Sequence, residues 1–439
     1  MFDLFAYVNC SHSPTVEDAW RLPDHEMADG YRNLSFWTDL ATTLDGAFAG
    51  LFFADAYNVA DRYRDSVAPT VRRGEQFPEN DPLPLLSALA GATESLGLVT
   101  TASASLYPPY LLAKKLSTLD DLTDGRVGWN VVTSAGRLEF ENVLDGRIPH
   151  DERYDRAAEF LTVVRSLWED SWDDDAVVRD AAGGTYADPE GVSFVDHEGE
   201  YFDVPGPHMT QPTPQRTPVI FQAGQSDRGR AFAARNAEAL FSFSLSRTGF
   251  ADYAADVRER AADAGRDPND LRLYPAITPY VAETAADAER ERDRVLDVIE
   301  PETGLVRLSN HLDHDYSQYD TDEPLEAIDA DGIRGALRAF LADDREWTVG
   351  EAAVRYARYP TAEFVGTPAS VADELEQWGE AGADGFVVTA PVVPGGLEAV
   401  VDLLVPELRD RGLVPRYGNE TLRERLLDRP ADDPAPPRR

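Results

Sequence analysis

The sequence predicts an α/β fold in which eight parallel strands and the helices between them form a (β/α)₈ TIM barrel. Short apolar runs alternate with longer stretches of helical periodicity along most of the chain, as βα units require. A length of 439 residues is compatible with one barrel domain that has long insertions. We expect this domain over residues 1–413, with insertions at about 171–217 and 300–345 at the carboxyl-end face. Residues 414–439 are expected to form a C-terminal extension with a flexible tail.

Eight runs have the length and the content of Val, Leu, Phe and Thr that favour strands. In chain order they are Phe2–Tyr7, Gly50–Ala54, Leu98–Ser103, Val127–Val132, Val219–Gln222, Ala239–Phe243, Leu271–Val281 and Gly385–Thr389. Between them, apolar residues recur at helical spacing. The expected helices include Asn33–Asp45, Leu83–Ser95, Pro109–Leu122, Arg153–Glu169, Asp227–Ala237 and Ala251–Ala264. Eight strands that alternate with helices favour a closed barrel over an open, doubly wound sheet.

Two segments interrupt this alternation. Residues 171–217 are rich in Asp, Gly and Pro, and the pattern around Tyr201–Val204 predicts a small hairpin. The second segment, Val306–Glu326, contains His311 and His314. Because long loops in compact domains often cover binding sites, we expect both segments to act as lids.

The chain is strongly acidic. It has 80 Asp and Glu residues against 41 Lys and Arg, a formal net charge of -39, and only two lysines, Lys114 and Lys115. This charge excludes binding to a nucleic-acid backbone, which needs a basic face. The surplus extends along the whole chain rather than forming a tail, which favours a halophilic surface. The alternative is ordinary solubility from a solvated acidic surface.

Cysteine and histidine usage limits the possible sites. The single cysteine, Cys10, allows no intrachain disulfide and no cysteine-rich zinc site. His311 and His314, in HLDH, favour a surface position in an acidic loop over a metal site, so we expect no metal. The start MFDLFAYVN is unlike a signal peptide, and no apolar stretch approaches the ~18 residues that cross a membrane. We therefore expect a cytoplasmic protein that binds no membrane.

In a barrel of this kind the functional side chains lie at the carboxyl ends of the strands. Those ends hold Asp55, Thr101, Ser103 and Asn130. Hydroxyl and amide groups suit a large polar ring with many donors and acceptors. Asp55 could instead cap the next helix, so both roles stay open. The pair of carboxylates that a glycosidase needs is missing, as are the G-x-S-x-G and phosphate-loop motifs.

Two further patterns suit an anion. The stretch PVIFQAGQSDRGRAFAAR predicts a strand, a tight turn through Gly224, Gln225 and Ser226, and a helix, which directs backbone N–H groups at one point. In PHDERYD, His150 and Tyr154 are four residues apart on one helix face, and both can hydrogen-bond a phosphate. The alternatives are a plain N-cap at Ser226 and a His–Tyr pair packed under a lid.

The runs STLDDLTDGRVGWNVVTS, HDERYDRAAEFLTVVRSLWE, GPHMTQPTPQRTPVIFQAGQSDRG and VGTPASVADEL resemble the bacterial-luciferase-like FMN-dependent monooxygenases. They are most similar to the branch of nitrilotriacetate, dibenzothiophene-sulfone, dimethylsulfide and long-chain alkane monooxygenases, from about Phe2 to about Leu413. The resemblance implies the oxygenase component of a two-component enzyme. Such an enzyme uses reduced FMN from a separate NAD(P)H:flavin reductase, and O₂, to insert one oxygen atom into a small organic substrate through a C4a-peroxyflavin.

The resemblance also implies roles for single residues. Tyr63, Gln76 and His311 match substrate-side positions and are the candidate catalytic residues. Ala135 stands where some members have a histidine, so the catalytic acid or base stays open. Flavin contacts are expected from Asp55, Thr101, Ser103, Asn130, His150, Tyr154, Gly224, Gln225 and Ser226.

The family further implies a homodimer or a homotetramer. Two alternatives remain for the function. One is a deazaflavin (F420)-dependent reductase or dehydrogenase of the same fold, which needs no O₂. The other is a non-catalytic paralogue that only binds flavin.

Overall fold

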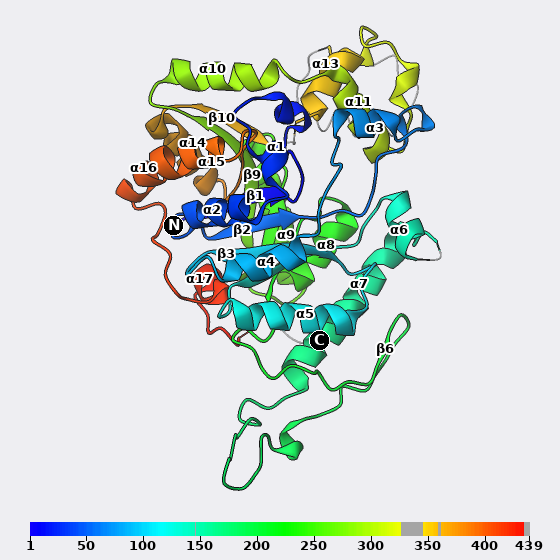
Figure 1. Ribbon diagram of the computed structural model, residues 1–439, viewed down its shortest axis with the longest axis vertical. Coiled ribbons are helices and arrows are strands. Elements are labelled where there is room, and N and C mark those ends of the chain that lie inside the picture. The colour runs from blue at the N-terminus through cyan, green and yellow to red at the C-terminus, as the bar shows by residue number, and fades with distance from the viewer. Residues whose placement is uncertain (145, 326–345, 359–360, 434–439) are drawn as a thin grey trace.

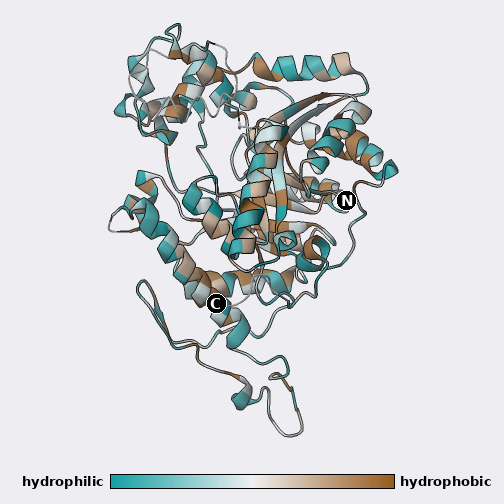
Figure 2. Cartoon of the chain, turned by 180° about the vertical axis from the view of Figure 1, so that it is seen from behind, coloured by the Kyte–Doolittle hydropathy of each residue, from teal (hydrophilic) through white to brown (hydrophobic). Residues whose placement is uncertain are grey.

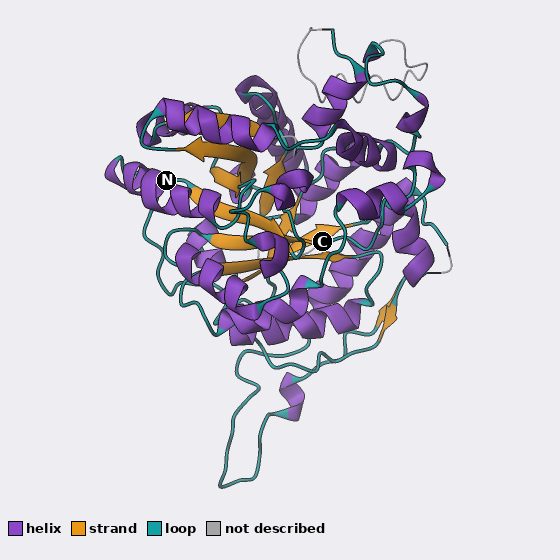
Figure 3. Cartoon of the chain, turned by 45° about the horizontal axis from the view of Figure 1, so that its top comes forward, coloured by secondary structure: helices purple, strands orange, loops and turns teal. Residues whose placement is uncertain are grey.

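The computed structural model describes residues 1–144, 146–325, 346–358 and 361–433. Within them, eight parallel strands close into a barrel, because β8 and β11 both pair with β9 and β11 also pairs with β1. Helices surround this barrel (Figure 3). The predicted fold is therefore confirmed, and all eight strands lie where the sequence places them. They are β1 (Asp3–Asn9), β2 (Gly50–Ala54), β3 (Gly97–Ser103), β4 (Val127–Val132), β7 (Val219–Gln222), β8 (Ala239–Ser242), β9 (Arg272–Val281) and β11 (Gly385–Thr389).

A further parallel strand, β10 (Ala362–Gly366), was not expected. It pairs with the carboxyl half of β9, from Ala362 opposite Ile277 to Gly366 opposite Val281. Because β9 is ten residues long, it reaches beyond its barrel neighbours and offers an edge to β10. β10 thus extends the sheet without entering the closed barrel.

The helices have their apolar faces toward the strands, and the outer helix surfaces are largely hydrophilic (Figure 2). Several start at a side-chain cap that follows a strand, as at Ser226, Ser246 and Thr367. The α-helices are α1 (Met27–Gly30), α2 (Leu34–Leu44), α3 (Ala68–Arg73), α4 (Pro82–Ala90), α5 (Pro109–Leu122), α6 (Arg137–Val143), α7 (His150–Arg165), α8 (Asp227–Asn236), α9 (Arg247–Asp263), α10 (Ala285–Leu296), α11 (Pro301–His311), α13 (Val349–Tyr356), α14 (Pro368–Glu380), α15 (Gly395–Ala399), α16 (Val405–Asp410) and α17 (Leu422–Leu427).

The last described segment closes the amino-terminal end of the barrel. Leu422 and Leu426 of α17 pack into the same apolar cluster as Phe5 and Phe221 inside the barrel. The side chains of Arg423 and Glu238 form an ion pair of 3.0 Å that has no exposed surface. Residues 417–427 are thus continuous with the barrel core. The division at residue 413 stays a prediction, and residues 434–439 of the expected flexible tail lie outside the described residues.

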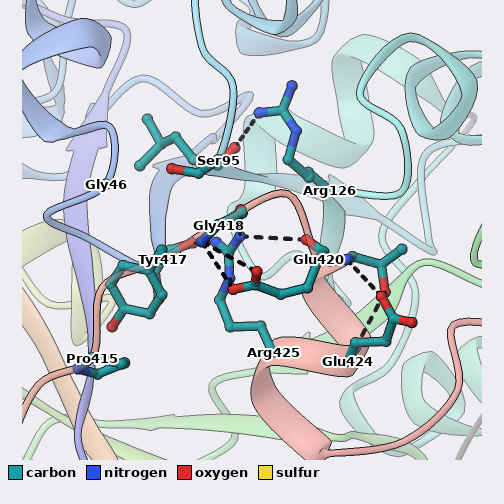
Figure 4. A network of polar contacts seen from close by, with 12 residues as sticks. Gly46, Ser95, Arg126, Pro415, Tyr417, Gly418, Glu420, Glu424 and Arg425 are labelled. Carbon is teal, nitrogen blue, oxygen red and sulfur yellow. Dashed lines mark hydrogen bonds and ion pairs between the residues drawn. The ribbon is translucent and has the colours of Figure 1, made fainter.

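A second arginine of α17 fixes the chain that leads into this helix (Figure 4). Arg425 Nη1 donates to the carbonyl of Ala49, at 2.7 Å, and Nε donates to Glu420. The guanidinium also lies over the ring of Tyr417, 5.0 Å from its centroid. These contacts attach the segment to the loop that precedes β2.

The first insertion does not lie where the sequence analysis expects it. Residues 171–217 connect α7 to β7, and a helix-to-strand connection lies at the amino-terminal end of the strands. Gln215 accordingly bonds to Asp120 and to the carbonyl of Val127, the first residue of β4. The segment, with its hairpin of β5 (His197–Glu198) and β6 (Asp203–Val204), extends away from the barrel (Figure 1). The expectation of a lid at the carboxyl-end face is therefore wrong for this segment.

The second insertion lies at the opposite, carboxyl end. Its described part contains α11 and α13, which pack against each other and, through α11, against α3 (Figure 1). A methyl group on Cα of Gly304 would lie 1.8 Å from the carbonyl oxygen of Ala353, so the two helices approach as closely as their backbones allow. Residues 326–345 of the expected insertion lie outside the described residues.

Candidate active site

A cavity of about 340 Å³ opens at the carboxyl ends of the strands. Strand ends form one part of its wall, and α11, α13 and the loop before α4 form the other. Five of the predicted site residues line it: Asp55, Gln76, Thr101, Asn130 and His311. The remaining lining residues are Tyr7, Phe52, Ala54, Val132, Ala223, Phe241, Phe243, Arg307, Tyr356 and Arg358.

A chain of hydrogen bonds orders the polar part of the strand wall. Thr101 Oγ1 donates its one hydrogen to the carbonyl of Phe53, at 2.8 Å, and therefore accepts from Asn130 Nδ2, at 2.9 Å. This fixes the orientation of the amide. Oδ1 of Asn130 is then buried without a hydrogen-bond partner among the described residues. An unpaired buried acceptor in a cavity wall fits a ligand with a ring N–H group.

Asp55 lies beside this chain, directly after β2. The residues that follow it are not helical until Tyr63, so the alternative of a helix cap does not apply. Burial and the nearby Asp81 raise the pKa of the Asp55 carboxyl to about 7. Its Oδ2 atom is buried and has no hydrogen-bond partner in the described part of the chain. Near neutral pH this carboxyl can donate or accept a hydrogen bond in the cavity.

The structure separates the two candidates on β3. Thr101 lines the cavity, whereas Ser103 does not. The hydroxyl of Ser103 accepts a hydrogen bond from Ser134 Oγ, at 2.9 Å, and another from the backbone N–H of Ser105. Ser103 thus holds together the turns that follow β3 and β4. It is a supporting residue of the wall in this geometry.

The helical wall is formed by Arg307, His311, Tyr356 and Arg358. Arg307 and His311 follow Gly304 by three and seven residues, so the close crossing of α11 and α13 sets their position. His311 Nδ1 and the hydroxyl of Tyr356 are 3.0 Å apart. Desolvation and the charge of Arg307 lower the pKa of His311 well below its ordinary range. His311 is therefore a neutral imidazole at physiological pH.

Two other candidate catalytic residues differ in their placement. Gln76 lines the cavity, and its backbone N–H donates to Glu17 Oε2, at 3.1 Å. Tyr63 is buried in an apolar cluster with Leu305 and Leu308 of α11 and is not part of the cavity lining. Its geometry supports a role in holding α11 rather than direct contact with a substrate.

The structure brings together His150, Tyr154 and the N-terminus of α8, which we call the anion site. The rings of His150 and Tyr154 have centroids 5.5 Å apart, and Tyr154 also contacts Phe232 of α8. A methyl group on Cα of Gly229 would lie 2.9 Å from the Tyr154 hydroxyl and 3.1 Å from Ser226 Oγ. Only a glycine leaves room for this approach. Three groups that can bind an anion thus converge at one helix end.

The turn before α8 completes the anion site. Ser226 Oγ accepts from the N–H of Gly229, at 3.1 Å, so the N-cap role is real, although the hydroxyl can still donate to a ligand. A side chain at Gly224 would lie 2.6 Å from the backbone of Gly229, so this position also requires glycine. Gln225 makes a long contact of 3.4 Å to the carbonyl of Phe241.

Four polar lining residues were not predicted from the sequence: Tyr7, Arg307, Tyr356 and Arg358. Two of them had a usable signal. Tyr7 alternates with Phe5 in β1, so both point to the barrel interior, and Arg307 precedes His311 by one helical turn. Tyr356 is the last residue of α13 and Arg358 follows this helix, so their position depends on a helix crossing that local patterns do not reveal.

Among the described residues, clusters of metal ligands and membrane-spanning helices are both absent. No group of three or more His, Cys, Asp or Glu side chains is arranged there to hold a metal ion. None of the helices in those ranges is long and apolar enough to cross a membrane.

The chain is similar to known proteins in both sequence and structure. The family model of luciferase-like monooxygenases matches residues 45–385. Dimethyl-sulfide monooxygenase of Hyphomicrobium sulfonivorans is 40% identical over 415 residues, which cover 93% of this chain and 86% of that protein. Nitrilotriacetate monooxygenase component A of Aminobacter aminovorans is 36% identical over 435 residues, covering 95% of each chain.

Solved structures are equally close. The crystal structure of DmoA from Hyphomicrobium sulfonivorans has a TM-score of 0.92 at 39% identity and covers 98% of this chain and 93% of that one. A riboflavin lyase with modified FMN and riboflavin has a TM-score of 0.89 at 32% identity, with 98% and 96% covered. With the barrel, the polar strand wall and these likenesses together, the chain belongs to the family of luciferase-like flavin-dependent monooxygenases.

Proposed function

We propose that this chain is the oxygenase component of a two-component FMN monooxygenase. It uses reduced FMN from a separate NAD(P)H:flavin reductase, together with O₂, to insert one oxygen atom into a small organic substrate. The observation that carries the proposal concerns Oδ1 of Asn130, in the cavity wall of a family member. This acceptor is buried and has no hydrogen-bond partner among the residues that the structure describes. A flavin ring with N–H groups matches that acceptor.

In this proposal the strand wall and the anion site hold the two ends of FMN. Asp55, Thr101 and Asn130 bind the ring, with Thr101 orienting the Asn130 amide. His150, Tyr154, the 224–226 turn and the N-terminus of α8 bind the phosphate. Reduced FMN, when bound, supplies the electrons that activate O₂. The residues of this chain bind, orient and shield it.

The apolar and helical parts of the cavity wall keep water away from the bound flavin. Phe52, Phe241 and Phe243 give the cavity an apolar floor. The tightly crossed helices α11 and α13 cover it from the carboxyl end. A dry site matters because water that reaches an activated oxygen species wastes it as hydrogen peroxide. The neutral imidazole of His311 can hold a proton at Nδ1 against Tyr356, or accept one there.

Anaerobic titration with reduced FMN at high salt tests the proposal. We expect saturable binding, and consumption of O₂ when a flavin reductase and NADH are added. Ser226→Ala should weaken binding of reduced FMN by about 1 kcal/mol, roughly fivefold. Ser246→Ala is a matched control, because Ser246 caps α9 with the same geometry, Oγ to the N–H of Gly249 at 3.2 Å. The absence of any flavin affinity would refute the proposal.

The same titration separates the alternatives. A deazaflavin-dependent reductase would bind the deazaflavin and not FMN, and a non-catalytic paralogue would bind FMN without consuming O₂. We also propose a halophilic, cytoplasmic protein that forms a homodimer or homotetramer, on the basis of its net charge of -39 and its family. Sedimentation and thermal unfolding across a KCl series test both points. A melting temperature that falls with added salt would exclude the halophilic surface.

A further inference from the structure

Two arginines line the cavity from its helical wall. Arg307, on α11, has 3% of its surface exposed, and the side chain of Arg358, after α13, is 15% exposed. Charged side chains are seldom this buried without compensation, because they lose their hydration. In a chain with a net charge of -39, two cations in one cavity wall indicate a ligand of opposite charge.

Two buried carboxyls, those of Glu17 and Glu75, lie near Arg307. Nη1 of Arg307 lies 3.8 Å from Oε1 of Glu17, beyond hydrogen-bonding distance. Burial raises the pKa of Glu17 and of the adjacent Glu75 above the ordinary range for glutamate. Near neutral pH these carboxyls are therefore partly protonated. The field of Arg307 still reaches the cavity, since it contributes to the low pKa of His311.

The guanidinium of Arg358 has more N–H donors than its one carboxylate contact uses. Its Nη1 donates to Glu363, while its Nε is buried with no hydrogen-bond partner among the described residues. A guanidinium has five N–H donors in a planar fork, and one carboxylate contact leaves several of them unused. Arg358 thus offers the cavity a second cation.

The other polar groups of the lining do not cancel this charge. Tyr356, Gln76 and the neutral His311 can donate hydrogen bonds without adding negative charge. Asp55 is the acidic residue of the lining, and burial raises its pKa to about 7. Near neutral pH the strand wall is therefore at most weakly anionic, and the helical wall is cationic.

Building on the proposed function, we propose that the substrate contains a carboxylate, which Arg307 and Arg358 bind at the helical wall. Hydrogen bonds between guanidinium and carboxylate are short and directional, so they fix which part of the substrate faces the flavin. Their strength persists in high salt, because a buried pair is screened far less than one on the surface. The two arginines are then specificity-determining residues.

A matched pair of probes tests the proposal on the FMN-loaded protein. Benzoate and benzamide have the same shape and differ in charge, and their binding is measured by calorimetry and by the change in FMN absorption. We expect benzoate to bind at least about tenfold more tightly than benzamide. Arg358→Gln should weaken benzoate binding by about tenfold and leave benzamide binding unchanged. Arg307→Gln should act in the same way where it folds.

Arg62→Gln provides the control. Arg62 forms a surface ion pair with Asp313 near the same helices and does not line the cavity. Its replacement by Gln removes one positive charge, as Arg358→Gln does. It should change neither affinity. Equal binding of the two probes, no binding of benzoate, or an equal loss for both probes in Arg358→Gln would overturn the proposal. Because flavin binding is measured first, failure to bind FMN would refute the proposed function instead.

Discussion

Replacing Arg423 by Met should show that the C-terminal segment is part of the barrel fold. The guanidinium of Arg423 donates to both carboxylate oxygens of Glu238, at 3.1 and 3.0 Å. It also donates to the carbonyls of Gln215, Thr217 and Ala431. Methionine fills a similar volume but removes the guanidinium that is hydrogen-bonded to the buried Glu238.

The magnitude follows from the burial of the pair. Neither side chain has exposed surface, and removal of one partner of such a pair costs about 3–5 kcal/mol. The unfolding entropy is about 2.1 cal/mol/K per residue, which gives about 0.9 kcal/mol/K for 439 residues. Dividing the loss of stability by the unfolding entropy predicts that the melting temperature falls by about 3–5 °C.

Differential scanning calorimetry at constant KCl measures this shift. Arg290→Met is the control, because Arg290 pairs with Asp287 on an exposed helix surface with 70% of its side chain exposed. It should move the melting temperature by less than about 1 °C. The double variant Arg423→Met/Glu238→Leu should recover most of the loss, since neither charge of the pair is then left without the other. If Arg423→Met behaves like the control, α17 does not stabilise the barrel as described.

Three further predictions concern the site. Burial raises the pKa of Glu75 to about 8, so the folded state keeps a proton that the unfolded chain releases above about pH 4.5, and stability falls as pH rises through this range. Glu75→Gln, which cannot ionise, should therefore gain a few kcal/mol relative to wild type between pH 5 and pH 9 in urea unfolding; a pH-independent difference would contradict this. Gly304→Ala should force α11 and α13 apart, costing about 1–3 kcal/mol and lowering kcat/KM while FMN affinity stays, and an unchanged kcat/KM would show that the crossing does not position the helical wall. Tyr154→Phe should weaken reduced FMN about fivefold in anaerobic titration, and unaltered affinity would place the phosphate elsewhere.

The barrel could be predicted because its signals are local. Each strand is a short apolar run, and the helix after it starts at a capping residue such as Ser226. β10 was not predicted, because its pairing depends on the extra length of β9 and not on its own five residues. The position of residues 171–217 was also missed, although their place between a helix and the next strand determines it.

In the candidate site, too, the residues with a local sequence signal were predicted and those without one were not. Asp55, Thr101 and Asn130 were found because the carboxyl ends of all barrel strands lie on the same face of the barrel, where the cavity opens. Arg358 was not found, because it reaches the cavity from the segment that follows α13, far in sequence from β1 to β4. Tyr63 shows the opposite error, since a polar side chain near the site can pack under a helix without reaching the cavity.

The net charge of the chain illustrates why totals do not predict a site. A charge of -39 suggests that an anionic cofactor and an anionic substrate would be repelled, yet salt screens surface charge within a few ångströms. Inside the barrel mouth, the potential depends on buried groups that salt screens little, here the cations Arg307 and Arg358. An acidic surface and a cavity that favours anions are therefore compatible, and high salt makes them more so, because it weakens the distant repulsion more than the near attraction.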